Sequence, residues 1–400
     1  MIYRKRLCLP GLLLILALFS VTRLAAQSTV QTPHFSLFAE AGAENALPSL
    51  SRELELRFEV YNDLFRFNPA ALPALLKVRV FMDPGAYRSY IIARTGTEQP
   101  GAVYLHYTQN ERRELVVLRG SPEEPAMLSH QAFIQFLRGF IPNPPAWIRE
   151  GFAIYFNGLK FDAVEGKLNY DENLAWLETI KGLGSSLLSP RDILMADTVV
   201  VPANSASGAV ADRYSRNFQI CSWALVSFLL NSGDYFRTLS ECFMVLSPQA
   251  QAAENSRAVM DRFSMWTDFA VLDRNFRAYL DSRKTFTELM EEGRKSYDTG
   301  NAVNAELYFM AAMEIRPNHY GPYYYLGLIY YEEMIYDMAE EYYKASLEYG
   351  ADEALVSYAL GVNAASAGRI SDAQYWLERA ASVDPGRYKT RVEDLLRRIQ

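Results

Sequence analysis

Residues 130–134 read His130-Gln131-Ala132-Phe133-Ile134, and residues 144–155 read Pro144-Pro145-Ala146-Trp147-Ile148-Arg149-Glu150-Gly151-Phe152-Ala153-Ile154-Tyr155. From Pro122 onward the apolar spacing is mainly helical, and a short proline-containing loop separates the two quoted segments. Asn143 is predicted to cap the second helix, with Pro144 and Pro145 in its first turn. The pattern therefore predicts two consecutive helices that face each other across a tight loop.

The first predicted helix carries one of the residues that a zinc site on a helix needs and lacks two others. Two histidines four residues apart on a helix share one face and can bind one zinc ion, as in His-Glu-x-x-His. The glutamate takes a proton from metal-bound water, and a third protein ligand completes the catalytic site. Here His130 keeps one ligand position, but Ile134 offers only carbon and Gln131 a neutral amide. We therefore predict no catalytic residue, with Gln131 and Ile134 as relic positions.

The second segment closely matches Trp-x-x-Glu-Gly-x-Ala-x-Tyr, and the chain thereby resembles the peptidase-MA-like, gluzincin-type metallopeptidases. Residues 214–225 look like the downstream core helix of that family, and the resemblance covers residues 34–284. It implies that His130 and Glu150 are metal ligands, vestigial in this chain.

Taken alone, His130 beside Leu128 and Leu137 fits an ordinary core or boundary histidine, and Glu150 fits a solvated helix residue or a partner of Arg149. The other histidines are His34, His106 and His319, and nothing in the sequence brings His106 to His130. We therefore expect no cofactor, with zinc only if the protein is an active enzyme.

The residues before Pro122 predict a small sheet with helices. Phe35 to Ala39 alternate like a short strand, and apolar residues from Leu47 to Phe65 form one helical stripe. Residues 77–82 alternate as a strand, and residues 103–108 and 115–118 form a predicted hairpin. Together with the helix pair, this order predicts an α+β, zincin-like domain over residues 27–284.

The first 26 residues have the pattern of an export signal. Arg4-Lys5-Arg6 precede an apolar stretch from Leu7 to Val21, and Leu24-Ala25-Ala26 offer small residues for cleavage. Retention as an anchor is the alternative, and no later segment is long and apolar enough to cross a membrane. We therefore expect a periplasmic or secreted protein of bacterial type.

Net charge and cysteine content bear on the expected partners and on the redox state of the thiols. Removal of residues 1–26 takes away four basic residues and no acidic ones, so the net charge moves from −7 to −11 and nucleic acid is not an expected partner. Cys221 and Cys242 remain. An oxidising compartment permits a disulfide, whereas their apolar helical surroundings favour two buried free thiols.

From Phe286 the chain repeats with a period of 34 residues. Three series keep this spacing: Gly293, Gly327 and Gly361; Ala305, Ala339 and Ala373; and Phe309, Tyr343 and Leu377. The pattern closely resembles the tetratricopeptide repeat, which implies an all-α superhelix over residues 285–400. The three repeats would be residues 286–319, 320–353 and 354–387, followed by a capping helix at 388–400. Small residues are expected where two helices approach closely, with larger apolar residues filling the gaps.

The same resemblance implies a concave groove lined by the first helix of each repeat, with the following residues facing it: Arg294, Tyr297, Tyr324, Leu328, Tyr331 and Tyr358. A tyrosine-rich groove suits an extended peptide or protein segment, because tyrosine gives a large contact area at low entropic cost. Packing of some of these tyrosines against the preceding domain is the alternative.

Together these features predict an exported pseudo-metallopeptidase that no longer cuts, with a repeat tail that binds or scaffolds a protein partner in the cell envelope. An active zinc metallopeptidase that uses His130 and Glu150 with an unidentified third ligand is one alternative. A purely structural repeat protein is the other.

Overall fold

The computed structural model describes residues 28–170, 172, 174–198 and 208–399. Contacts divide the chain into two units. The front unit comprises residues 1–173 and 185–276, and the repeat unit comprises residues 174–184 and 277–400. The predicted export signal, residues 1–26, lies outside the described residues.

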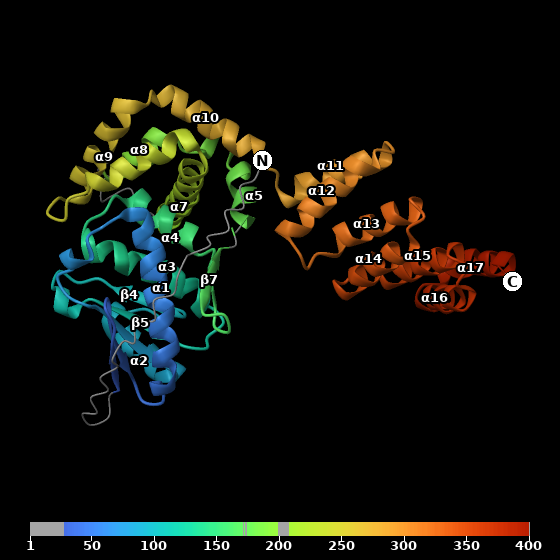
Figure 1. The fold of residues 1–400 in the computed structure, drawn as a ribbon, viewed down its shortest axis with the longest axis horizontal. Helices are drawn as coiled ribbons and strands as arrows, with labels where there is room; N and C mark the ends of the chain where they lie inside the picture. The colour runs from blue at the N-terminus through green and yellow to red at the C-terminus, as the bar shows by residue number, and fades with distance from the viewer. Residues whose placement is uncertain (1–27, 171, 173, 199–207, 400) are drawn as a thin grey trace. The chain divides into compact units, whose positions relative to one another are not determined.

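A mixed five-strand sheet forms the base of the front unit (Figure 1). In chain order the strands are β1 (Thr29–Gln31), β2 (Phe35–Ala39), β3 (Leu76–Phe81), β4 (Ala102–Leu105) and β5 (Glu114–Leu118). Their order in the sheet is β1-β2-β3-β5-β4, with β2, β3 and β5 parallel and both outer strands antiparallel to their neighbours. The predicted β4–β5 hairpin is confirmed, and β4 lies at an edge of the sheet.

Helices cover both faces of this sheet. α1 (Leu47–Phe65) and α3 (Glu124–Phe140) lie side by side on one face, and α2 (Pro84–Thr95) packs on the other (Figure 1). On the α2 face, Tyr87 and Ile91 join Phe81 and Val116 in one apolar cluster. Because both faces are covered, all five residues of β5 are buried.

The rest of the front unit is mainly helical. Its further elements are α4 (Ala146–Phe156), the hairpin β6 (Leu159–Asp162) and β7 (Lys167–Tyr170), α6 (Pro190–Leu194), α7 (Gly208–Asn231), α8 (Gly233–Met244), α9 (Ala252–Trp266) and α10 (Phe269–Ser282), whose end passes into the repeat unit. α4 packs along α7, so the second quoted segment lies in the interior of the unit.

The repeat unit is a series of antiparallel helix pairs, as predicted. The pairs are α11 (Phe286–Asp298) with α12 (Ala302–Ile315), α13 (Tyr320–Glu332) with α14 (Tyr336–Glu348), and α15 (Glu353–Ser366) with α16 (Ile370–Val383). α17 (Pro385–Ile399) closes the series. The unit also takes in α5 (Ala175–Gly182), whose Lys181 Nζ lies 2.8 Å from Glu288 Oε2 of α11.

Direct contacts explain why the repeat spacing is strict. A Cβ atom added at Gly327 would lie 2.5 Å from the ring of Tyr343, so the glycine and aromatic series pack against each other. The same contact recurs between Gly293 and Phe309 and between Gly361 and Leu377, each at 2.6 Å. Each helix pair can therefore close only if the small residue stays small.

Candidate functional site

The candidate site lies where α3, α4 and the edge strand β4 meet. Phe133 and Phe136 of α3 and Trp147 and Ile148 of α4 are buried, and they hold the two helices in the core. This packing leaves His130 and Glu150 half-buried on the facing sides of the helix pair. The two predicted ligand residues are thus brought together.

The start of α4 differs from the prediction. The Ala146 backbone N–H donates to Asp197 Oδ2 at 2.8 Å, and Asp197 lies on a short 3-10 helix, Ala196–Thr198. The Asn143 side chain makes no cap, and the backbone carbonyl of Asn143 accepts from Asn255 Nδ2 at 2.9 Å. The predicted Asn143 cap is wrong, because a carboxylate from a distant segment satisfies the helix start instead.

Gly151 brings α7 close enough to reach Glu150. A Cβ atom at this position would lie 2.6 Å from the carbonyl oxygen of Ser222, so only glycine allows the two helices their approach. As a result Gln219 of α7 donates from Nε2 to Glu150 Oε2 at 3.1 Å. Arg149 Nε donates to Glu150 Oε1 at 2.7 Å, so both carboxylate oxygens accept protein donors.

His130 Nε2 lies 4.0 Å from Glu150 Oε2. Burial lowers the pKa of His130, and the Arg149 charge lowers it further against the opposing effect of Glu150. The imidazole is therefore neutral near pH 7, and its contact with Glu150 is not an ion pair.

Gln131 and Ile134 of α3 have different surroundings. Gln131 Oε1 accepts the backbone N–H of Tyr104 on β4 at 3.0 Å. Tyr104 would otherwise present this N–H at the edge of the sheet, so the Gln131 amide ties α3 to the edge strand. Ile134 is a half-buried side chain one helical turn from His130.

These residues do not fit a catalytic zinc ion. Two donors 4.0 Å apart could each reach one ion at about 2.0–2.2 Å, but a catalytic site takes three protein ligands. Ile134 cannot supply the third, and no set of three or more His, Cys, Asp or Glu suited to a metal occurs within residues 28–170, 172, 174–198 and 208–399. Both oxygens of Glu150 are also engaged by protein donors.

The His106 ring lies 5.8 Å from the ring of Tyr104, the residue whose backbone N–H donates to Gln131. His106 follows β4, and its pKa is lowered to about 4 by burial and then by the charges of Arg138, Arg113 and Arg149. These three arginines were not predicted as site residues. Helical spacing could have indicated Arg138, because it follows His130 and Ile134 at the same interval of four residues on α3.

The six predicted groove residues lie on the first helix of each pair, α11, α13 and α15. Arg294 is exposed, and the other five are half-buried. The Tyr297 hydroxyl donates to Glu332 of the next pair, and the Tyr331 hydroxyl lies 3.2 Å from Ser366 Oγ, one repeat further on. Equivalent tyrosines thus join successive first helices and remain partly accessible.

The ring of Tyr358 packs 5.1 Å from that of Tyr388 on α17, and Tyr324 packs 6.0 Å from Tyr343. Leu328 belongs to the apolar cluster around Tyr343. These three residues contribute to the packing of the array as well as to its surface.

Cys221 on α7 and Cys242 on α8 are buried free thiols. Burial raises the pKa of both, and that of Cys242 reaches about 12. Both thiols are therefore protonated at neutral pH, and neither has the character of a nucleophile.

The fold and the site define a two-unit protein, a mixed α/β unit joined to a helical repeat array. Comparison with models of known protein families finds no match, and comparison with curated proteins finds none either. Among the helices that the structure describes, none combines the length and the apolar character needed to span a bilayer.

Proposed function

We propose that this protein is an exported, non-catalytic relative of the peptidase-MA-like metallopeptidases, and that its tetratricopeptide tail recruits a protein partner in the bacterial cell envelope. The single observation that carries the non-catalytic part of the proposal is the hydrogen bond that Gln131 accepts. The Gln131 amide accepts the Tyr104 backbone N–H, so the residue at the base position supports structure instead of chemistry.

The hydrogen bonds that Glu150 accepts also support the non-catalytic part of the proposal. A working ligand must present a free carboxylate oxygen to the metal, whereas Glu150 accepts donors from Arg149 and Gln219. The 4.0 Å approach of His130 to Glu150 favours the alternative of an active zinc enzyme, which would need a third ligand.

The tail is proposed as the recruiting module because the first helices of its first two pairs each carry a half-buried tyrosine at the same repeat position. Tyr297 and Tyr331 occupy equivalent repeat positions, and each joins its helix to the next by its hydroxyl. Half-buried tyrosines that are already fixed lose little entropy when a peptide covers them. An extended protein segment would lie across these rings.

Replacement of Tyr297 and Tyr331 together by alanine is expected to weaken partner capture at least tenfold, because tyrosine is enriched among residues that dominate binding energy. The measurement is recovery of the partner from envelope extract by the full chain, followed by affinity measurement with the purified partner. The control is Tyr375→Ala, an exposed tyrosine on α16, the second helix of its pair.

Equal recovery by the double variant and the control would contradict recruitment through the first helices. A partner held fully by a chain without residues 286–400 would point to the front unit instead.

A further inference from the structure

A polar pocket lies on the α2 face of the sheet, opposite the face that α1 and α3 cover. Its volume is about 660 Å³, and its lining comes from β2, β3, the end of α2 and the segment that joins β4 to β5. α2 shares one apolar cluster with Phe81 and Leu118, at the carboxyl ends of β3 and β5. Side chains alternate along a strand, so Lys77 and Arg79 lie on the same face as Phe81, and they line the pocket with Glu114.

Arg79 is the centre of an ion-pair network in this lining. Its Nε donates to Glu114 Oε2 at 3.0 Å, and its Nη1 donates to Glu40 Oε1 at 2.5 Å. The Tyr90 hydroxyl donates to the other oxygen of Glu114, and Arg94 Nε lies 3.8 Å from that same oxygen. The two arginines and the two carboxylates balance each other, and the network fixes the end of α2 to the sheet.

Two further cations line the pocket without a carboxylate partner among the described residues. Lys77 Nζ donates to the backbone carbonyl of Glu111 at 2.7 Å, and this neutral acceptor leaves its charge unbalanced. Arg112 stacks on the ring of Tyr107, with its Cζ 4.6 Å from the ring centre. The Arg79 Nη2 atom adds a donor for which the described part of the chain supplies no acceptor.

Glu111 is the carboxylate that opposes these two cations. It lines the same pocket, but it is exposed on the segment between β4 and β5, where water screens its charge. Glu114 and Glu40 belong to the network of Arg79. With Glu40 counted, four cations face three carboxylates, so the pocket keeps an excess of positive charge.

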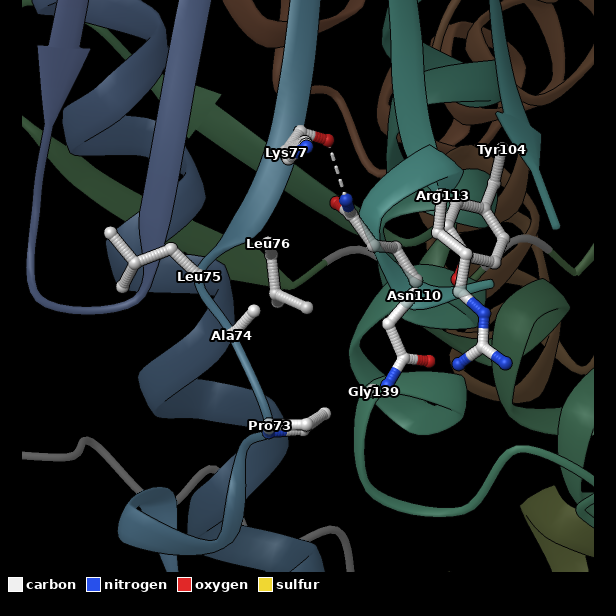
Figure 2. Close-up of a pocket in the computed structure, with 10 residues that line it drawn as sticks. Pro73, Ala74, Leu75, Leu76, Lys77, Tyr104, Asn110, Arg113 and Gly139 are labelled. Atoms are coloured by element: carbon white, nitrogen blue, oxygen red, sulfur yellow. Dashed lines mark hydrogen bonds between the residues drawn. The ribbon is translucent and has the colours of Figure 1, made fainter. Parts of the chain in front are cut away.

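Lys77 is fixed at both ends of its side chain. Gln135 of α3 is 1 % exposed, and its Nε2 donates to the Lys77 backbone carbonyl at 2.7 Å, the dashed line in Figure 2. This bond holds the backbone of Lys77 from the other face of the sheet, and the Glu111 carbonyl holds its Nζ. A lysine that is already ordered loses little side-chain entropy when it binds a ligand.

The size of the pocket indicates a ligand larger than a free anion. Sites for small organic molecules measure roughly 300–1,000 Å³, and the volume of about 660 Å³ falls within that range. Apolar surface for the body of such a ligand comes from Phe38, Ala93 and Tyr107.

We propose that this pocket binds a small organic molecule through a carboxylate or phosphate group, with Lys77 and Arg112 as the anchors. A guanidinium group can donate to two oxygens at once, and the stacking on Tyr107 orients its plane. Lys77 adds a compact positive charge beside it. His130 lies on α3, which covers the other face of the sheet, so the pocket can bind its ligand whether or not a metal binds at His130.

The test is isothermal titration calorimetry of the purified full chain with phenyl phosphate, benzoate and inorganic phosphate, at constant ionic strength set by chloride. Saturable binding of phenyl phosphate or benzoate is expected, and the tighter of the two shows whether the ligand carries a phosphate or a carboxylate. Inorganic phosphate is expected to bind at least tenfold more weakly than the better organic anion, because it lacks the apolar body that the pocket accommodates.

Lys77→Gln and Arg112→Gln are each expected to weaken the binding of the better organic anion at least tenfold, because a charge-assisted hydrogen bond is lost. Glu111→Gln is expected to strengthen it several-fold, because the opposing carboxylate is removed. Arg88→Gln is the matched control, since Arg88 is an exposed arginine of α2 outside the lining, and its affinity should equal that of the wild type.

A gain of affinity in Glu111→Gln cannot arise from unfolding, so the test holds even if Lys77→Gln perturbs the start of β3. No saturable binding of either organic anion, or equal affinity in the wild type and in both cation variants, would overturn the proposal. Inorganic phosphate that binds as tightly as phenyl phosphate and benzoate would overturn the organic ligand.

Discussion

Replacement of Gly151 by alanine is expected to destabilise the front unit strongly. The added Cβ would lie 2.6 Å from the carbonyl oxygen of Ser222 and 2.9 Å from Val226 Cγ2. The Ser222 oxygen belongs to the backbone of α7, so it can yield only if the whole helix shifts. Overpacking costs about 1–3 kcal/mol, and a backbone clash belongs at the upper end of that range. Urea unfolding followed by tryptophan fluorescence measures the change in the free energy of unfolding.

The matched control for this substitution is Gly233→Ala at the start of α8. A Cβ atom there meets nothing within 4 Å, and the backbone is not in the left-handed region. The urea midpoint should stay at or slightly above that of the wild type, because alanine reduces the entropy of the unfolded chain. Equal midpoints for the two variants would contradict the close approach of α4 and α7.

Glu53→Gln is expected to cause the second large loss of stability. Glu53 and Arg57 of α1 are 5 % and 2 % exposed, and Arg57 Nη2 donates to Glu53 Oε1 at 2.8 Å. Without the carboxylate, the guanidinium stays buried and charged with no counterion. Breaking a buried ion pair in this way typically costs about 3–5 kcal/mol. The measurement is again urea unfolding, with the exposed Glu44→Gln as the control for the loss of one negative charge.

A double variant separates the ion pair from other roles of Glu53. Replacement of both partners by apolar residues, Glu53→Leu with Arg57→Met, removes the charges together and should recover most of the stability that Glu53→Gln loses. A double variant that is less stable than Glu53→Gln would show that Arg57 stabilises the fold by another route, such as its bond to the Leu159 carbonyl at 3.4 Å.

The local elements could be predicted from the sequence, but the order of the strands could not. Alternation identified β2 and β3, and the polar turn at residues 109–113 identified the β4–β5 hairpin. The parallel pairing of β2, β3 and β5 depends on where the connecting helices pack, which no local pattern records. α2 was missed because only Tyr87 and Ile91 are buried along it, too few for a clear stripe.

The repeat unit was easier to predict because its spacing arises from direct contacts. Gly327 is constant in the series because Tyr343 occupies the space of a Cβ atom, so the sequence period reports a packing constraint. α17 begins at Pro385 and not at residue 388, which is the usual uncertainty at helix ends.

The candidate site could be predicted only in part. The helix pair with His130 and Glu150 follows from the quoted segments, and the structure brings the two side chains within 4.0 Å. The partners of Glu150 and the cap of α4 come from Gln219 and Asp197, both distant in sequence. Such long-range contacts leave no local signal.

The measurement that tests the central claim most directly is the zinc content of the purified chain after equilibration with zinc and removal of the unbound ion. His130→Ala and Ile134→His are measured beside it. The wild type and His130→Ala are predicted to hold no bound zinc, whereas Ile134→His adds an imidazole one turn from His130 and is expected to gain it. One zinc ion per wild-type chain, lost in His130→Ala, would contradict the account and make the protein a metal-dependent hydrolase candidate.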